Sequence, residues 1–68
     1  MYIVIEIQKN ADGIMSDIVT SFNTLSEAYN KYYSVLAFAA ISKLPVHSAA
    51  LMSEEGFVVE SKCFKHDS

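Results

Sequence analysis

The sequence has few of the residues that often stabilise or shape small proteins: its 68 residues include one cysteine, one proline, two glycines and no tryptophan. The single cysteine, Cys63, excludes a disulfide framework within the chain and fits a reducing compartment, so we expect a cytoplasmic protein. Two glycines in separate turns cannot form a glycine-rich phosphate loop, which excludes the usual nucleotide-binding motifs.

Positive charge is also scarce. Five Lys and Arg stand against eight Asp and Glu, which gives a formal net charge of -3. Nucleic-acid affinity depends mainly on clustered cations that neutralise phosphates. Because the sequence has no such cluster, we expect no nucleic-acid partner.

Long hydrophobic runs are absent as well. The longest, residues 35–41, is far shorter than the roughly 20 residues with which a helix crosses a bilayer. Residues 1–7 lack the cationic start of a signal peptide, and Glu6 interrupts their apolar pattern. We therefore expect neither a membrane segment nor a targeting segment.

Apolar residues make up 51% of the chain. A domain of this length hides only about 60% of the surface of its unfolded chain, so a monomer would be marginally stable. Because no disulfide can form within the chain, oligomerisation is the remaining way to stabilise the fold. We expect one domain over residues 1–68, with a folded core over 1–64 and a frayed polar tail over 65–68.

Two hairpins are predicted from alternating apolar and polar residues. Residues 2–8 and 15–22 have the period of strands, and the turn residues 10–13 lie between them. After Pro45, residues 46–52 and 57–64 form a second pair of strands around a turn at 53–56.

The segment between the hairpins is predicted to be a helix. Thr24 and Glu27 have the spacing of a capping box, so the helix should begin at Leu25. Pro45 disfavours helical geometry at the residue before it, so the helix should end near Ser42 or Lys43. Helical spacing places one set of residues on the core face: Leu25, Tyr29, Tyr32, Leu36, Ala39 and Ala40.

These elements predict an α+β fold of order ββαββ, with two antiparallel hairpins in a four-stranded sheet packed on one helix. A three-residue turn with Gly56 in the left-handed position sets the register of the second hairpin. It pairs Leu51 with Val59 and His47 with Cys63. We expect Ile3, Ile5, Ile7, Leu51 and Val59 on one face of the sheet, and Tyr2, Val4, Val19, Met52, Val58 and Phe64 on the other.

Both faces of this sheet are apolar, whereas one helix covers only one of them. The helix also carries Phe38 and Ile41 on its polar side. We therefore expect a homo-oligomer, most simply a homodimer, that buries the uncovered sheet face, the Phe38 and Ile41 side of the helix, or both.

The candidate site residues fall into three groups. Candidate contacts to a partner or second subunit are Phe38, Ile41, Tyr33 and Tyr29. Candidate contacts to a small ligand are Tyr32, Lys31 and His47. Cys63 is a candidate reactive thiol if His47 lies beside it, with a buried core pair as the alternative.

No cofactor or metal is expected. Cys63 and His66 have a C-x2-H spacing, but positions three apart on a strand point to opposite faces, and zinc prefers four ligands. No arrangement of nucleophile, base and oxyanion donors is recognisable, so enzyme activity is disfavoured.

Residues distributed over nearly the whole chain resemble a group of short uncharacterised proteins from intestinal bacteria and their phages. They include Ile5-Glu6-Ile7-Gln8, Asn10-Ala11-Asp12-Gly13, Lys31-Tyr32, Val35-Leu36-Ala37, Pro45-Val46-His47, Glu55-Gly56, Cys63 and His66. The resemblance implies a phage or mobile-element origin and no particular activity. The Asp12-Gly13 hairpin and the residues 22–28 are similar to HicB-type antitoxins, which implies a dimer that neutralises an RNase toxin.

The sequence thus supports three hypotheses of function. The first is a non-enzymatic, homo-oligomeric interaction protein of phage or mobile-element type that binds an unidentified protein partner. The second is a protein that sequesters a small ligand or nucleotide at a subunit interface. The third is an antitoxin-like inhibitor.

Overall fold

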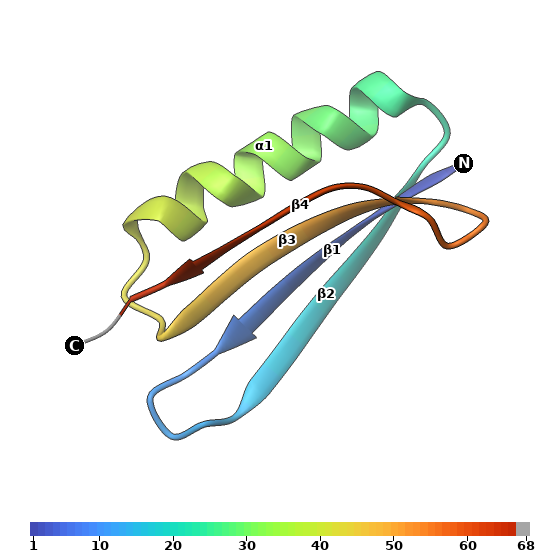
Figure 1. The fold of residues 1–68 in the computed structure, drawn as a ribbon. Helices are drawn as coiled ribbons and strands as arrows, with labels where there is room; N and C mark the ends of the chain where they lie inside the picture. The colour runs from blue at the N-terminus through green and yellow to red at the C-terminus, as the bar shows by residue number, and fades with distance from the viewer. Residues whose placement is uncertain (67–68) are drawn as a thin grey trace.

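The computed structural model describes residues 1–66 and contains one antiparallel sheet with one helix on one face (Figure 1). Along the chain the elements are β1 (Tyr2–Lys9), β2 (Met15–Phe22), α1 (Leu25–Ile41), β3 (Val46–Ser53) and β4 (Val58–Lys65). The strands lie in the order β2-β1-β3-β4, so the two hairpins meet where β1 pairs with β3. The predicted α+β fold of order ββαββ is confirmed.

Both hairpins turn at a glycine with positive φ. Gly13 has φ 84° and Gly56 has φ 93°, values that side chains with a Cβ rarely adopt. In the first turn the Asn10 side-chain oxygen accepts hydrogen bonds from the backbone amides of Asp12 (2.9 Å) and Ile14 (3.0 Å). Turn chemistry visible in the sequence therefore fixes both hairpins.

The helix begins at Leu25, as predicted, with Thr24 as its N-cap. The Thr24 hydroxyl accepts from the Glu27 amide at 3.3 Å and donates to the Glu27 carboxylate at 2.8 Å. The Glu27 carboxylate thus accepts from the hydroxyl and not, as in a complete capping box, from a backbone amide. The helix ends at Ile41 with Ser42 as its C-cap, which agrees with the predicted end.

The core lies between α1 and the two central strands. Its buried apolar residues are Val4, Ala28, Tyr32, Val35, Ala39, Ala49 and Leu51. The predicted helix face is partly wrong, since Ala40 and Leu25 are exposed and Leu36 is half-buried. The buried stripe of the helix includes Ala28 and Val35, which the prediction did not contain. The small side chains of Ala28 and Ala39 let the helix pack closely on the sheet at this stripe.

The predicted register of the second hairpin is wrong by one residue. Met52 pairs with Val58, but Leu51 pairs with Glu60, so Val59 is an extra residue in β4. This bulge shifts every later pair, and His47 faces Phe64 instead of Cys63. His47 and Cys63 therefore lie on opposite faces of the sheet.

The predicted division of the sheet into two faces needs the same correction. Leu51 pairs with Val4 and lies on the helix-covered face, not with the isoleucines. Val19 pairs with Ile5, and Met52 pairs with both Ile3 and Val58, so these residues share the face turned away from the helix. The expectation that both faces are apolar remains valid with this exchange.

The end of β4 is held in place. The strand continues to Lys65, and the backbone amide of His66 donates to the Pro45 carbonyl at 3.0 Å. Lys65 and His66 thus belong to the folded part, whereas they were expected to fray. The rest of the expected frayed tail, Asp67 and Ser68, lies outside the described residues.

Over residues 1–66, no helix combines the length and apolar character needed to cross a membrane.

Candidate functional site

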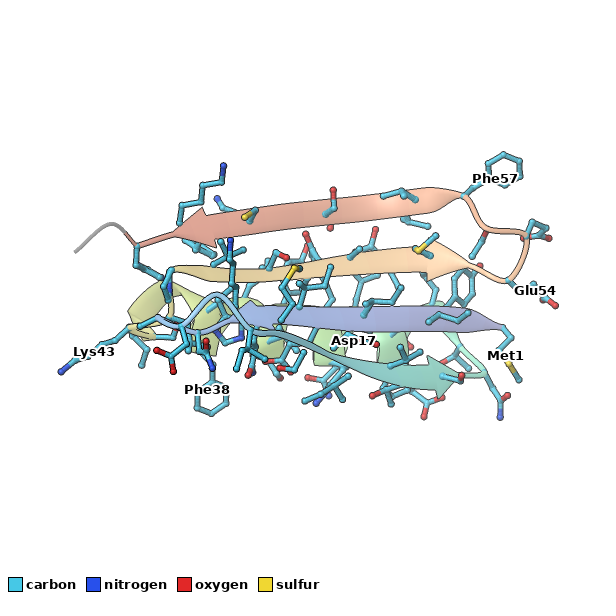
Figure 2. All side chains as sticks on the ribbon, turned by 90° about the horizontal axis from the view of Figure 1, so that it is seen from below. Met1, Asp17, Phe38, Lys43, Glu54 and Phe57 are labelled. Carbon is cyan, nitrogen blue, oxygen red and sulfur yellow. The ribbon has the colours of Figure 1, made fainter. Side chains whose placement is uncertain are left out.

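A groove runs between α1 and the strands β1 and β3. Its volume is ≈ 360 Å³. It is lined by Glu6, Gln8, Lys31, Ser34, Val35, Phe38 and His47. Figure 2 shows the Phe38 side chain projecting past the β2 side of the sheet, where 68% of its surface is exposed. The groove therefore has a polar floor and one aromatic wall.

The floor of the groove is a hydrogen-bonded chain from β1 through β3 to the end of α1. The His47 Nε2 lies 2.7 Å from the Glu6 Oε2, and the His47 Nδ1 lies 3.0 Å from the Ser42 Oγ. The Gln8 side-chain amide also donates to the Glu6 Oε2 at 2.9 Å. Glu6 and His47 are both largely buried, so these bonds form away from solvent.

Opposing effects act on the Glu6 carboxyl. Burial raises the pKa of Glu6, but the hydrogen bonds from His47 and Gln8 and the charges of His47 and Lys31 outweigh it. The net result is a pKa below the ordinary value of 4.5. Glu6 is therefore a carboxylate at neutral pH and accepts a hydrogen bond from the His47 Nε2–H.

The network accommodates both charge states of His47. Because Nε2 donates to Glu6, a neutral His47 has a free Nδ1 that accepts the Ser42 hydroxyl hydrogen. When Nδ1 is protonated it donates to the Ser42 Oγ, and the hydroxyl turns toward the Ala39 carbonyl oxygen, 3.4 Å away. Every polar atom of the network keeps a partner in either state.

The order Ser42, His47, Glu6 is that of a hydrolase triad, but its position does not suit acyl transfer. Ser42 caps the C-terminus of α1, where the helix presents carbonyl oxygens and the negative end of its dipole. An oxyanion formed there would face partial negative charge, whereas catalysis requires donors. These hydrogen bonds instead anchor the end of the helix to β1 and β3.

A second histidine also contacts this helix end. The His66 Nε2 lies 2.7 Å from the Ala39 carbonyl oxygen, and since a carbonyl only accepts, Nε2 carries the hydrogen. The last turn of α1 has no basic residue of its own. His66, the residue after β4, supplies one of the donors that a helix C-terminus requires, while His47 contacts the capping residue Ser42 through its side chain.

The candidate ligand contacts have different surroundings. Lys31 and His47 both line the groove together with Glu6. Tyr32 is only 3% exposed and packs in the core with Val35 and Leu51, so its ring is not available for stacking on a ligand. Burial and the charge of Glu60 raise the pKa of the Tyr32 phenol.

The candidate partner contacts lie on two flanks of α1. Phe38 and Ile41 are three residues apart on the helix and both exposed, and Phe38 lines the groove. The Tyr29 and Tyr33 rings stack at 5.7 Å on the other flank, where the Tyr33 hydroxyl lies 3.5 Å from the Glu60 carboxylate on β4. The nearby Glu60 charge raises the pKa of Tyr33. These four residues therefore do not form one continuous patch.

Cys63 lies on the face of the sheet opposite the groove and is exposed. Its cross-strand partner is Ser48, and His47 points to the other side. Neither the activated thiol beside His47 nor the buried pair with His47 is formed. Among residues 1–66 no three His, Cys, Asp or Glu side chains are arranged to hold a metal ion.

The sheet face turned away from the helix is a second candidate surface. Figure 2 views it with α1 behind the sheet. Ile3, Ile5 and Ile7 follow β1 along its centre, while Ser48, Ala50, Ser61 and Cys63 beside them are small and line a shallow depression. Nothing in residues 1–66 covers this face, and Val19 at its β2 edge is 56% exposed. This uncovered apolar face is therefore a candidate interaction surface.

Glu6 in the groove and Ser42 at the end of the helix are not among the site residues predicted from the sequence. The sequence does indicate Glu6, because it lies two residues from Val4 and therefore on the same face of β1 as this core residue. A carboxylate on the buried face of a strand requires a partner. Identifying His47 as that partner requires the β1 and β3 pairing, which the sequence does not specify.

Comparison of the chain with protein-family models, with curated proteins and with solved structures finds no match.

Proposed function

We propose that this chain is a small homo-oligomeric interaction protein that acts by binding protein and not by catalysis. The observation that supports the proposal is the uncovered apolar face of the sheet, centred on Ile3, Ile5 and Ile7. A second subunit on this face hides apolar area, which is the main favourable term in protein association. It also supplies the stability that a domain of this size lacks.

The helix side remains available in such an oligomer. Phe38 and Ile41 are 68% and 79% exposed on α1, on the side of the molecule opposite the open sheet face. Large exposed apolar side chains next to a polar groove are typical of a protein contact. We propose that these two residues contact the protein partner, and the resemblance to short phage proteins favours a phage or mobile-element setting.

The experiment is the mass in solution by light scattering at micromolar concentration, for the wild type and for two matched variants. Ile5→Lys places a charge at the centre of the open face, and Ile18→Lys places one on the other face of the adjacent strand, where Ile18 is already exposed. We expect a multiple of 7.6 kDa for the wild type and Ile18→Lys, and a lower mass for Ile5→Lys. A monomeric wild type contradicts the proposal.

A small-ligand binder is the second candidate, and the groove favours it. Lys31 and the Gln8 amide offer donors to an anionic group beside the Phe38 ring. Ligand binding raises the melting temperature by mass action. A thermal-shift screen over nucleotides and metabolites, repeated with Lys31→Ala, tests this candidate, and a flat response for the wild type removes it.

A further inference from the structure

At the centre of the open sheet face, large and small side chains follow one another across the strands in a similar order in two successive rows. Two central rows of paired residues cross it, and they read from β2 to β4 as Val19, Ile5, Ala50, Ser61 and as Asp17, Ile7, Ser48, Cys63. In the first row the two large side chains lie on β2 and β1, and the two small ones on β3 and β4. In the second row Ile7 on β1 likewise lies beside the small Ser48 and Cys63. In these two central rows the large side chains form a ridge on β2 and β1, and the small ones form a trough on β3 and β4; in the row at one end the order differs, since Ile3 lies between Ser21 and Met52 and the larger Met52 and Val58 lie on β3 and β4.

A surface with a ridge and a trough side by side fits a second copy of itself. A two-fold axis that runs along the strands, between β1 and β3, places β1 over the partner's β3 and β2 over the partner's β4. Residues at the same height then meet, so Ile5 lies over Ala50 and Val19 over Ser61. By symmetry each contact occurs twice, as in an isologous interface.

We propose that a second copy of this chain covers the open sheet face with its two-fold axis parallel to the strands. This inference rests on the proposed function, since it names the partner and the geometry of the oligomer. Sheets packed face to face keep their strand directions within about 30° of each other, which this axis allows.

The alternative two-fold axis, across the strands, gives a poor fit. It places each strand over its own copy, so that Ile5 meets Ile7 and Ala50 meets Ser48. In the two central rows large side chains then meet large ones and small ones meet small ones, which leaves both overlap and voids at the centre of the interface.

Charge favours the same choice. With the axis along the strands, Asp17 on β2 lies over Cys63 of the other copy, two residues from the cationic Lys65. With the axis across the strands, the Asp17 carboxylate faces Val19 and has no partner, which is unfavourable. Lys9 and Lys65 lie at the end of the sheet, where their long side chains reach solvent.

The projected size of the face is of the same order as that of a stable interface. Each of the four strands has eight residues. Strands about 4.8 Å apart that rise about 3.4 Å per residue give a projected area of roughly 500 Å². Protruding side chains increase the accessible area above this value, and stable interfaces bury about 800 Å² per partner.

Chemical cross-linking with a short bis-methanethiosulfonate reagent tests the geometry. In one chain, residue 17 and Cys63 are on strands three spacings apart, about 14 Å, which exceeds the reach of the reagent. In the proposed dimer Asp17 lies over the other copy's Cys63. We therefore expect Asp17→Cys to shift on a denaturing gel from 7.6 kDa to twice that mass.

Two controls distinguish the alternatives. Ser21→Cys lies on the same face of β2, two rows away from Cys63 of the other copy, and should not cross-link. The wild type should not cross-link either, because the two Cys63 side chains lie at opposite edges. Circular dichroism checks that the exposed Asp17 and Ser21 positions tolerate cysteine.

The outcomes separate this inference from the proposed function. Cross-linking of the wild type through its two Cys63 side chains indicates an axis across the strands and overturns the inference. A dimeric mass by light scattering without cross-linking of Asp17→Cys also overturns it, while the proposed function stands. A monomeric mass overturns both.

Discussion

The buried Glu6 and His47 pair gives the sharpest prediction for stability. Glu6→Ala removes the only carboxylate of the network and leaves the His47 Nε2 and the Gln8 amide without an acceptor. Leaving a buried hydrogen-bonding group without its partner costs about 1–3 kcal/mol, so the two donors together cost about 2–6 kcal/mol. A domain of this length is expected to have about 3–10 kcal/mol of stability in total. Glu6→Ala should therefore be largely unfolded or close to it.

Glu6→Gln keeps an acceptor oxygen and removes only the charge. The His47 hydrogen bond changes from a charge-assisted one to a neutral one, and the loss should be about 1–2 kcal/mol. Glu60→Ala is the matched control, because Glu60 is exposed and contacts only the Tyr33 hydroxyl at 3.5 Å. It should change the stability by less than about 0.5 kcal/mol.

Urea denaturation followed by circular dichroism measures these differences. All variants are compared at one protein concentration, because association couples stability to concentration. The expected order of stability is Glu60→Ala, then Glu6→Gln, then Glu6→Ala. Equal and small losses for both Glu6 variants would show that the pair does not hold β1 to β3, and the reasoning would be refuted.

Three further predictions concern pH, the helix end and the helix surface. The lowered pKa of Glu6 contributes stability that is present above its ordinary value of 4.5 and is lost as the pH falls through the folded-state value, so urea midpoints should fall in acid, and less steeply for Glu6→Gln than for the wild type. His66→Ala removes the donor to the Ala39 carbonyl and should cost about 0.5–1.5 kcal/mol in urea, while His66→Gln, which keeps a donor, should recover part of the loss; no difference between the two variants counts against the capping role. Phe38→Asp alters an exposed side chain outside the proposed dimer face, so it should leave the helical signal and the light-scattering mass unchanged and abolish capture of the partner protein, with Ser34→Asp on the same flank as the control; a changed mass would assign Phe38 to the oligomer contact instead.

Local sequence signals predicted most of the fold. Asn10 and Gly13, Gly56, and the capping pair Thr24 and Glu27 fix turns and a helix start through contacts between residues close in sequence. These positions are correct because their conformations depend little on the rest of the chain. The order ββαββ and the apolar character of both sheet faces follow from the same local patterns.

The errors arise where one residue changes a long-range pairing. Val59 is a bulge, and nothing in its neighbourhood distinguishes it from a regular strand residue. Since side chains alternate along a strand, this single extra residue moved His47 away from Cys63 and removed the predicted thiol pair. The Glu6 and His47 contact was missed for a related reason, because it depends on which strands become neighbours.

The central claim of the account is that a second copy covers the open sheet face with Ile5 over Ala50. An isotope-filtered NOE experiment on a mixed dimer, with one subunit labelled and the other not, tests this contact directly. The filter is essential because Ile5 and Ala50 are also paired within each chain. The account predicts intermolecular NOEs between the Ile5 methyls and the Ala50 methyl. A mixed sample that gives only intramolecular NOEs at this pair would contradict it.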